Sequence, residues 1–143
     1  MIMPYISFDG NCEEAFLWYA EIFGGKIEHM SKYGDIPENP AEPMPKEIQN
    51  KVMHAQLILT ETGGISGADA MQPVEKGTAI SIHAHLPSEK QARNVFSALS
   101  QEGSVWGKLV TNPPPDNNGI SGCVQDKYGI TWIISAMKSV SVQ

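Results

Sequence analysis

Residues 9–27, DGNCEEAFLWYAEIFGGKI, contain the pattern that decides the fold. Asn11 is a good helix N-cap, and Glu14 three residues later completes the spacing of a capping box. Gly24 and Gly25 can take the left-handed conformation that ends a helix. We therefore predict an amphipathic helix here, with a strand on either side. Its apolar face follows the helical period and consists of Cys12, Ala15, Phe16, Tyr19, Ile22 and Phe23.

Residues 87–105 are a degraded copy of this stretch. Ser88 and Gln91 repeat the capping-box spacing, and Gly103 repeats the glycine stop. Chance similarity of two βαβ segments is the alternative, but the shared order of elements, caps and stops favours duplication of one unit. The matching pairs are Ala15 with Ala92, Tyr19 with Phe96, Ile22 with Leu99, Gly25 with Gly103 and Ile27 with Val105.

Strand patterns fill most of the remaining chain. Each half then reads β-α-β-β-β, so we predict an α+β fold in a single domain, 1–143, with module one at 1–72 and module two at 73–143. The single helix of each module covers only one face of its four-stranded sheet. Pairing the two modules would bury the faces that stay open. The predicted strands span residues 4–8, 26–33, 51–60, 65–70, 78–86, 104–110, 119–125 and 130–136.

A proline-rich segment at 34–50 interrupts the first module. Pro37, Pro40, Pro43 and Pro45 exclude regular structure from most of it. A loop of this length inside a compact domain is usually a lid, a binding loop or a mobile excursion. We favour a mobile flap beside a pocket, while the proline content alone fits a disordered surface loop equally well.

Composition narrows the possible partners. The net charge is −6 and the ten basic residues are scattered, which argues against a nucleic-acid partner. No apolar run approaches the ~20 residues of a membrane helix, and the N-terminus lacks the regions of a signal peptide. Cys12 and Cys123 match no metal-site spacing and are expected to be reduced thiols of a cytoplasmic protein.

Four stretches that together span nearly the whole chain follow a family pattern: PYISFDGNCEEAFLWYAEIFGG, KYGDIP, VMHAQL and DKYGITWIIS. In these stretches the chain resembles the vicinal oxygen chelate superfamily, which has the glyoxalase, bleomycin-resistance and dioxygenase fold, and more narrowly its PhnB-like branch, also labelled 3-demethylubiquinone methyltransferase-like. The resemblance implies paired βαβββ modules that form a curved mixed sheet around a cavity, commonly in a homodimer. GGISGADA and KLVTNPPPDNNGISG depart from the usual pattern of the branch.

The resemblance does not imply a metal or cofactor site in this chain. In metal-using relatives, His, Gln or Glu side chains on four strands point into the cavity. The corresponding positions here are Pro4, Ser66, Ala79 and Ile133, none of which is a good ligand for a divalent metal. A strand followed by a glycine-rich loop and a helix, as a nucleotide-like cofactor would need, is also missing from the sequence. We therefore expect no metal and place no weight on the methyltransferase label.

Histidines offer a different constellation. His83 and His85 are two residues apart on one predicted strand and so share a face, and His54 is expected in the other module. With Glu28, Asp9 or Asp69 they could form a metal site or an acid–base pair. The alternative, which the spacing alone favours, is a pair of solvent-facing strand histidines. His29 is expected to be an exposed strand residue.

Several aromatic side chains are candidates for a ligand pocket. Trp106 and Trp132 lie on late strands and could form an apolar wall, although core packing is the competing expectation for Trp132. Asp9, Asp35 and Asp126 lie in turns, where Asp is expected for structural reasons. Polar tips could come from Tyr5, Tyr33 and Tyr128.

Three functions follow as hypotheses, and the sequence does not identify a substrate. The first is a metal-free protein that binds a small molecule in its sheet cavity, with pocket candidates Tyr5, Tyr33, His54, His83, Trp106 and Trp132. The second is a metal-dependent lyase, isomerase or dioxygenase that uses His54, His83 or His85. The third is a non-catalytic dimerising module.

Overall fold

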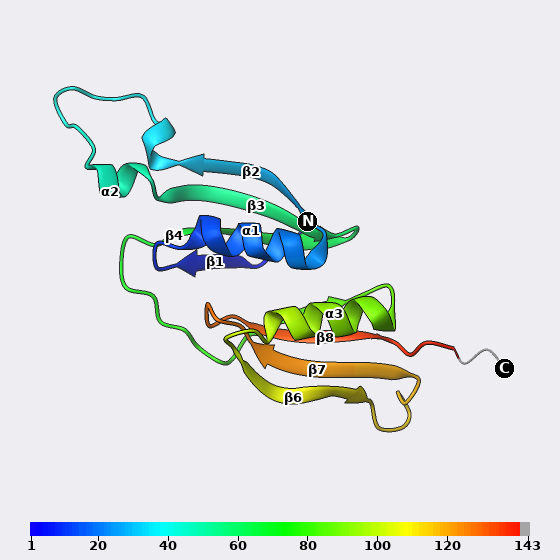
Figure 1. The fold of residues 1–143 in the computed structure, drawn as a ribbon. Helices are drawn as coiled ribbons and strands as arrows, with labels where there is room; N and C mark the ends of the chain where they lie inside the picture. The colour runs from blue at the N-terminus through cyan, green and yellow to red at the C-terminus, as the bar shows by residue number, and fades with distance from the viewer. Residues whose placement is uncertain (141–143) are drawn as a thin grey trace. The chain divides into compact units, whose positions relative to one another are not determined.

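The computed structural model describes residues 1–140 of the chain. They divide into two compact units, the first ending at Glu75 and the second beginning at Lys76, and each unit is built around its own four-stranded sheet (Figure 1). The polar tail after Met137 is predicted from the sequence to fray, and its last residues, 141–143, lie outside the described residues. Within the described part of the chain, no helix is both long and apolar enough to cross a lipid bilayer.

The first unit follows the predicted order of elements. Its strands lie in the order β1-β4-β3-β2, with β1 parallel to β4 and the other pairs antiparallel. A 3₁₀ turn, η1, and a short helix, α2, lie between β2 and β3. The elements are β1 (Tyr5–Phe8), α1 (Cys12–Phe23), β2 (Lys26–Lys32), η1 (Tyr33–Asp35), α2 (Lys46–Gln49), β3 (Val52–Thr60) and β4 (Gly63–Asp69).

The second unit repeats this topology. Its strands lie in the order β5-β8-β7-β6, with β5 parallel to β8 and the other pairs antiparallel. Both units are therefore βαβββ modules, and the predicted α+β class is confirmed. The elements are β5 (Ile82–His85), α3 (Glu89–Leu99), β6 (Ser104–Thr111), β7 (Gly119–Gln125) and β8 (Thr131–Met137).

A shared glycine position supports the internal repeat. A Cβ atom on Gly25 would lie 2.4 Å from the carbonyl oxygen of Ile58, on the strand next to β2. A Cβ atom on Gly103 would lie 2.4 Å from the carbonyl oxygen of Gln125, on the strand next to β6. Since both contacts are far too short for a real Cβ atom, glycine is required at the same place in both units.

Each unit buries one face of its sheet under its own helix. In the first unit α1 packs on β3 and β4, and in the second α3 packs on β7 and β8. The predicted apolar faces are confirmed, because nearly all of their residues are buried. The buried helix residues are Cys12, Ala15, Phe16, Tyr19 and Phe23 in α1, and Ala92, Val95, Phe96 and Leu99 in α3.

The helix ends differ in part from the prediction. Ser88 caps α3 as expected, since its hydroxyl accepts a hydrogen bond from the Gln91 amide at 3.1 Å. Gly24 ends α1 with φ 66°. Asn11, however, makes no side-chain cap on α1. The chain after α3 turns with Glu102 at φ 59°, so Gly103 is not the left-handed residue there.

One predicted strand needs correction. The strand predicted over 78–86 is only β5, because Ile82 pairs with Trp132 near the start of β8. Residues before Ile82 would lie beside the β7–β8 turn, which contains no strand for them to pair with.

Most of the proline-rich segment 34–50 lacks helix and strand, as predicted. It contains the short helix α2, and it begins in η1, where the Asp35 carboxylate accepts the Lys32 amide at 2.7 Å.

Candidate functional site

The first sheet has a polar face on the side opposite α1, which we call its far face. Residues alternate along β1 and β3, so that Ile6 and Leu57 are buried towards the helix while Tyr5 and His54 point the other way. The far face is thereby equipped with groups that donate and accept hydrogen bonds. It carries Tyr5, Ser7, His29, His54, Gln56 and Ser66.

Three rings form a row across this far face. The ring centroids of Tyr5 and His54 are 5.7 Å apart with an interplanar angle of 21°, and those of His29 and His54 are 5.8 Å apart. The Tyr5 hydroxyl lies 3.3 Å from Nδ1 of His54. Tyr5 and His54 can meet although β4 lies between their strands, because β4 presents only small side chains there, Ser66 and Ala68. Tyr5 and His54 are among the pocket residues predicted from the sequence, whereas His29 was expected only to be an exposed strand residue.

The surroundings of Tyr5 also change the pKa of its phenol. Its side chain is half-exposed, yet partial burial raises the pKa of the phenol, and the charges of Cys12 and Tyr33 raise it further. Tyr33 lies in η1, where its backbone N–H donates to the Lys51 carbonyl at 3.1 Å. The phenol of Tyr5 is therefore neutral at physiological pH and can donate a hydrogen bond.

The second sheet carries a His–Ser–His cluster on its own far face, opposite α3. Nε2 of His83 lies 2.7 Å from the Ser135 hydroxyl, and Nδ1 of His85 lies 2.8 Å from the same atom. The two imidazoles thus share a face, as predicted, and meet at one oxygen. Both histidines are exposed, whereas Ser135 is 8% exposed. Ser135 is not among the predicted site residues, because nothing in the nearby sequence distinguishes it from other strand serines.

The two candidate tryptophans occupy different environments. Trp132 is completely buried, and its indole N–H donates to the Asp126 carboxylate at 2.9 Å, so it is a core residue of the second unit and not part of the far face. Asp126 also accepts the backbone amides of Tyr128 and Ile130, which confirms its structural role in the turn. Trp106 lies at an irregularity of β6 and is 48% exposed.

The family metal positions can now be tested against the strand register. Pro4 and Ala79 lie outside the strands, and the ladder partners of Ser66 and Ile133 are Tyr5 and His83. A phenol, a serine and an isoleucine do not suit a divalent metal, which leaves His83 as the one common ligand. Within residues 1–140, no three His, Cys, Asp or Glu side chains gather as a metal site. These residues do not fit the metal that relatives of this fold hold.

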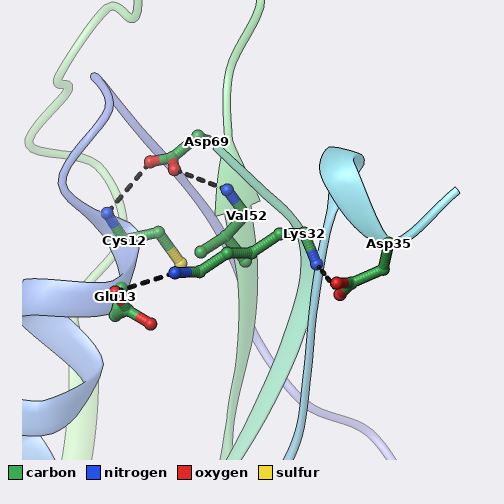
Figure 2. A network of polar contacts seen from close by, with 6 residues as sticks. All are labelled: Cys12, Glu13, Lys32, Asp35, Val52 and Asp69. Carbon is green, nitrogen blue, oxygen red and sulfur yellow. Dashed lines mark hydrogen bonds and ion pairs between the residues drawn. The ribbon is translucent and has the colours of Figure 1, made fainter. Parts of the chain in front are cut away.

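Asp69 has a structural role that the sequence did not reveal. Its buried carboxylate accepts the backbone amide of Cys12 at 2.9 Å and that of Val52 at 2.8 Å (Figure 2). The end of β4 is thereby tied to the starts of α1 and β3, and Asp69 provides the cap expected from Asn11. This engagement also removes Asp69 from the metal-ligand set considered above.

Cys12 and Lys32 complete the surroundings of Asp69. Burial raises the pKa of the Cys12 thiol to about 12, and the charges of Asp69 and Glu13 add to that effect. The Lys32 ammonium lies 3.2 Å from the Glu13 carboxylate, which links β2 to the first turn of α1 (Figure 2). The thiol is therefore an unreactive core group at neutral pH.

Comparison with known proteins extends over nearly the whole chain. A family model described as 3-demethylubiquinone-9 3-methyltransferase matches residues 1–135. Protein PA1353 from Pseudomonas aeruginosa is 30% identical, with a TM-score of 0.80 and coverage of 97% of this chain and 98% of that one.

Two structures from Bacillus cereus show the same fold at lower identity. A putative 3-demethylubiquinone-9 3-methyltransferase, PhnB protein, is 22% identical, with a TM-score of 0.72 and coverage of 96% of this chain and 98% of its own. A glyoxalase family protein is 12% identical, with a TM-score of 0.63 and coverage of 97% and 94%. The chain belongs to the 3-demethylubiquinone-9 3-methyltransferase family, and its fold is glyoxalase-like.

Proposed function

We propose that the protein binds a small, planar, polar organic molecule on the far face of its first sheet, without the superfamily metal. The observation that carries the proposal is the row formed by Tyr5, His54 and His29. Flat rings side by side provide stacking surface, and their heteroatoms provide hydrogen bonds. Small-molecule sites typically combine such an aromatic surface with a few oriented polar groups.

The chemistry of the row points to the kind of ligand. A neutral phenol and a neutral imidazole each donate one hydrogen bond and accept others. Gln56, beside His29 in the β2–β3 ladder, adds an amide with both functions. Asp, Glu, Lys and Arg are absent from this row of side chains. A heteroaromatic ring or a phenol with neutral polar substituents therefore suits the face better than a strongly charged ligand.

The segment after Tyr33 is the proposed flap. Tyr33 is close enough to influence the pKa of Tyr5, and the proline-rich residues 36–45 follow directly after η1. Prolines restrict the backbone, so such a segment can lie over a ligand with little loss of conformational entropy on binding. The flap, the sheet cavity expected from the family, the homodimer and the cytoplasmic location stay predictions.

Metal-free binding is proposed from the donor set. The register positions Tyr5, Ser66 and Ile133 do not suit a divalent ion, and His83 is hydrogen-bonded to Ser135. A metal-dependent reaction through His54, His83 or His85 remains the alternative. Elemental analysis of protein purified without an affinity tag distinguishes the two, because one tightly held divalent ion per chain would overturn the metal-free proposal.

A thermal-shift screen of a heteroaromatic and phenolic metabolite panel tests binding. A ligand present at a hundred times its Kd stabilises the folded state by about 2.7 kcal/mol, which raises the melting temperature by several degrees. We expect Tyr5→Phe and His54→Ala to abolish the shift, measured alongside isothermal titration. Glu61→Gln, which changes an exposed residue of the β3–β4 turn outside the row, is the control and should keep it. A panel that produces no shift, or one that Tyr5→Phe leaves intact, would contradict the proposal.

A further inference from the structure

The His–Ser–His cluster of the second unit carries an inference of its own. A serine hydroxyl has one hydrogen and can donate it to only one of the two imidazoles around Ser135. When both imidazoles are neutral, the other imidazole must present its N–H to the same oxygen. The oxygen is then placed between a base that can take its proton and a donor that can stabilise its negative charge.

We propose that Ser135 is a nucleophile that accepts acyl groups from activated esters. Serine is a weak nucleophile until an adjacent base activates it, and histidine is the usual base. The distances of 2.7 Å and 2.8 Å place both histidines within the reach that proton transfer requires.

Exposed apolar side chains lie beside Ser135 on its strand. Ile133 and Met137 lie on either side of it on the same face of β8, and they are 37% and 51% exposed. His83 and His85 are exposed on β5, the edge strand of this sheet. An ester with an apolar acyl or aryl group would find apolar contacts next to the hydroxyl, which identifies the substrate class as uncharged aryl or alkyl esters.

The reaction balances without a cofactor. The Ser135 oxygen forms a bond to the carbonyl carbon of the ester while its proton passes to the acceptor imidazole. The bond between that carbon and the leaving oxygen then breaks, and the imidazolium protonates the leaving group. Water hydrolyses the acyl-serine by the same route, with its proton passing to the imidazole and then to the serine oxygen as the carboxylic acid departs.

The test uses the full chain and p-nitrophenyl acetate. We expect a burst of nitrophenolate stoichiometric with the chain and, after rapid quenching, an acetyl group on Ser135 by peptide mass mapping. Ser135→Ala should remove the burst, and His83→Asn or His85→Asn should slow it by about a hundredfold or more if that residue is the base. Circular dichroism and melting curves verify that each variant is folded.

Two neighbours on the same face provide matched controls. Ser121 pairs with Ser135 across the β7–β8 ladder, but its hydroxyl donates to the Asn112 side chain and contacts no imidazole in the described structure. Cys123 pairs with Ile133 and is the competing nucleophile. Ser121→Ala and Cys123→Ser should both keep the burst. Acetylation of Cys123 or of a lysine in place of Ser135, or a burst that survives in folded Ser135→Ala protein, would overturn the proposal.

Discussion

Among substitutions that remove one charge from the first unit, Asp69→Asn should be the most destabilising. The buried carboxylate accepts two backbone amides, from Cys12 and Val52, with one oxygen each. An asparagine offers one oxygen and one NH₂ group, so one amide keeps its acceptor and the other faces a donor. The sequence separations of 57 and 17 residues make both bonds tertiary contacts that the local chain cannot replace.

The magnitude follows from the bonds that are lost. A hydrogen bond to a charged group contributes about 1.5–3 kcal/mol, and a buried donor left without a partner costs about 1–3 kcal/mol. We therefore expect Asp69→Asn to lower the free energy of unfolding by roughly 2–3 kcal/mol, and Asp69→Ala by roughly 3–5 kcal/mol, on the basis of these values. Either loss is a large fraction of the ~5–15 kcal/mol that stabilises an ordinary domain.

Urea unfolding followed by far-ultraviolet circular dichroism measures this loss. Native-state hydrogen exchange locates it, because the amides of Cys12 and Val52 should exchange faster in the variant. Removal of the Asp69 charge should also lower the pKa of Cys12 below about 12, since that charge is one of the causes of its elevation. The control is Glu61→Gln, which removes an exposed carboxylate in the β3–β4 turn and should change stability by less than about 0.5 kcal/mol. An Asp69→Asn variant as stable as this control would refute the reasoning.

Two further predictions concern the buried thiol of Cys12 and the tightly packed glycine at position 103. Folding favours the neutral thiol of Cys12, whose pKa rises from 9.0 to about 12. Its stabilising contribution is full below about pH 9 and declines as the pH rises towards 12, so alkaline urea titrations should show a loss of stability that is reduced in Cys12→Ala. Gly103→Ala forces a Cβ atom against the Gln125 carbonyl oxygen and should cost about 1–3 kcal/mol in urea unfolding. Gly77→Ala, where nothing lies within 4 Å of the added atom, should cost less than about 0.5 kcal/mol; equal losses would refute the steric argument.

Local periodicity was sufficient to predict most of the fold. The apolar faces of α1 and α3, the stop at Gly24, the Ser88 cap and the β7–β8 hairpin all depend on residues close together in the sequence. The matched glycines of the repeat were also visible, and the structure shows that Gly25 and Gly103 share a steric cause. These features can be predicted from short stretches of sequence, because the periods of helices and strands are visible within a few residues.

The candidate site was predicted only in part. Alternation correctly placed His83 and His85 on one face. It could not indicate that His29 joins Tyr5 and His54 in a row, or that Ser135 lies between two imidazoles. Most of these contacts join residues far apart in the chain, with separations of 49 residues for Tyr5 and His54 and of 52 and 50 residues for Ser135 and its two histidines.

The sequence by itself therefore determined which elements form, their order and the duplication of one βαβββ unit. Only the tertiary structure decided strand register, and with it that Tyr5 and His83, in place of Pro4 and Ala79, lie beside Ser66 and Ile133. It also decided that Asp69 caps α1 from a distant strand. The physical reason is that a shift of one residue in register turns a side chain to the opposite face of a sheet, and long-range hydrogen bonds determine the register.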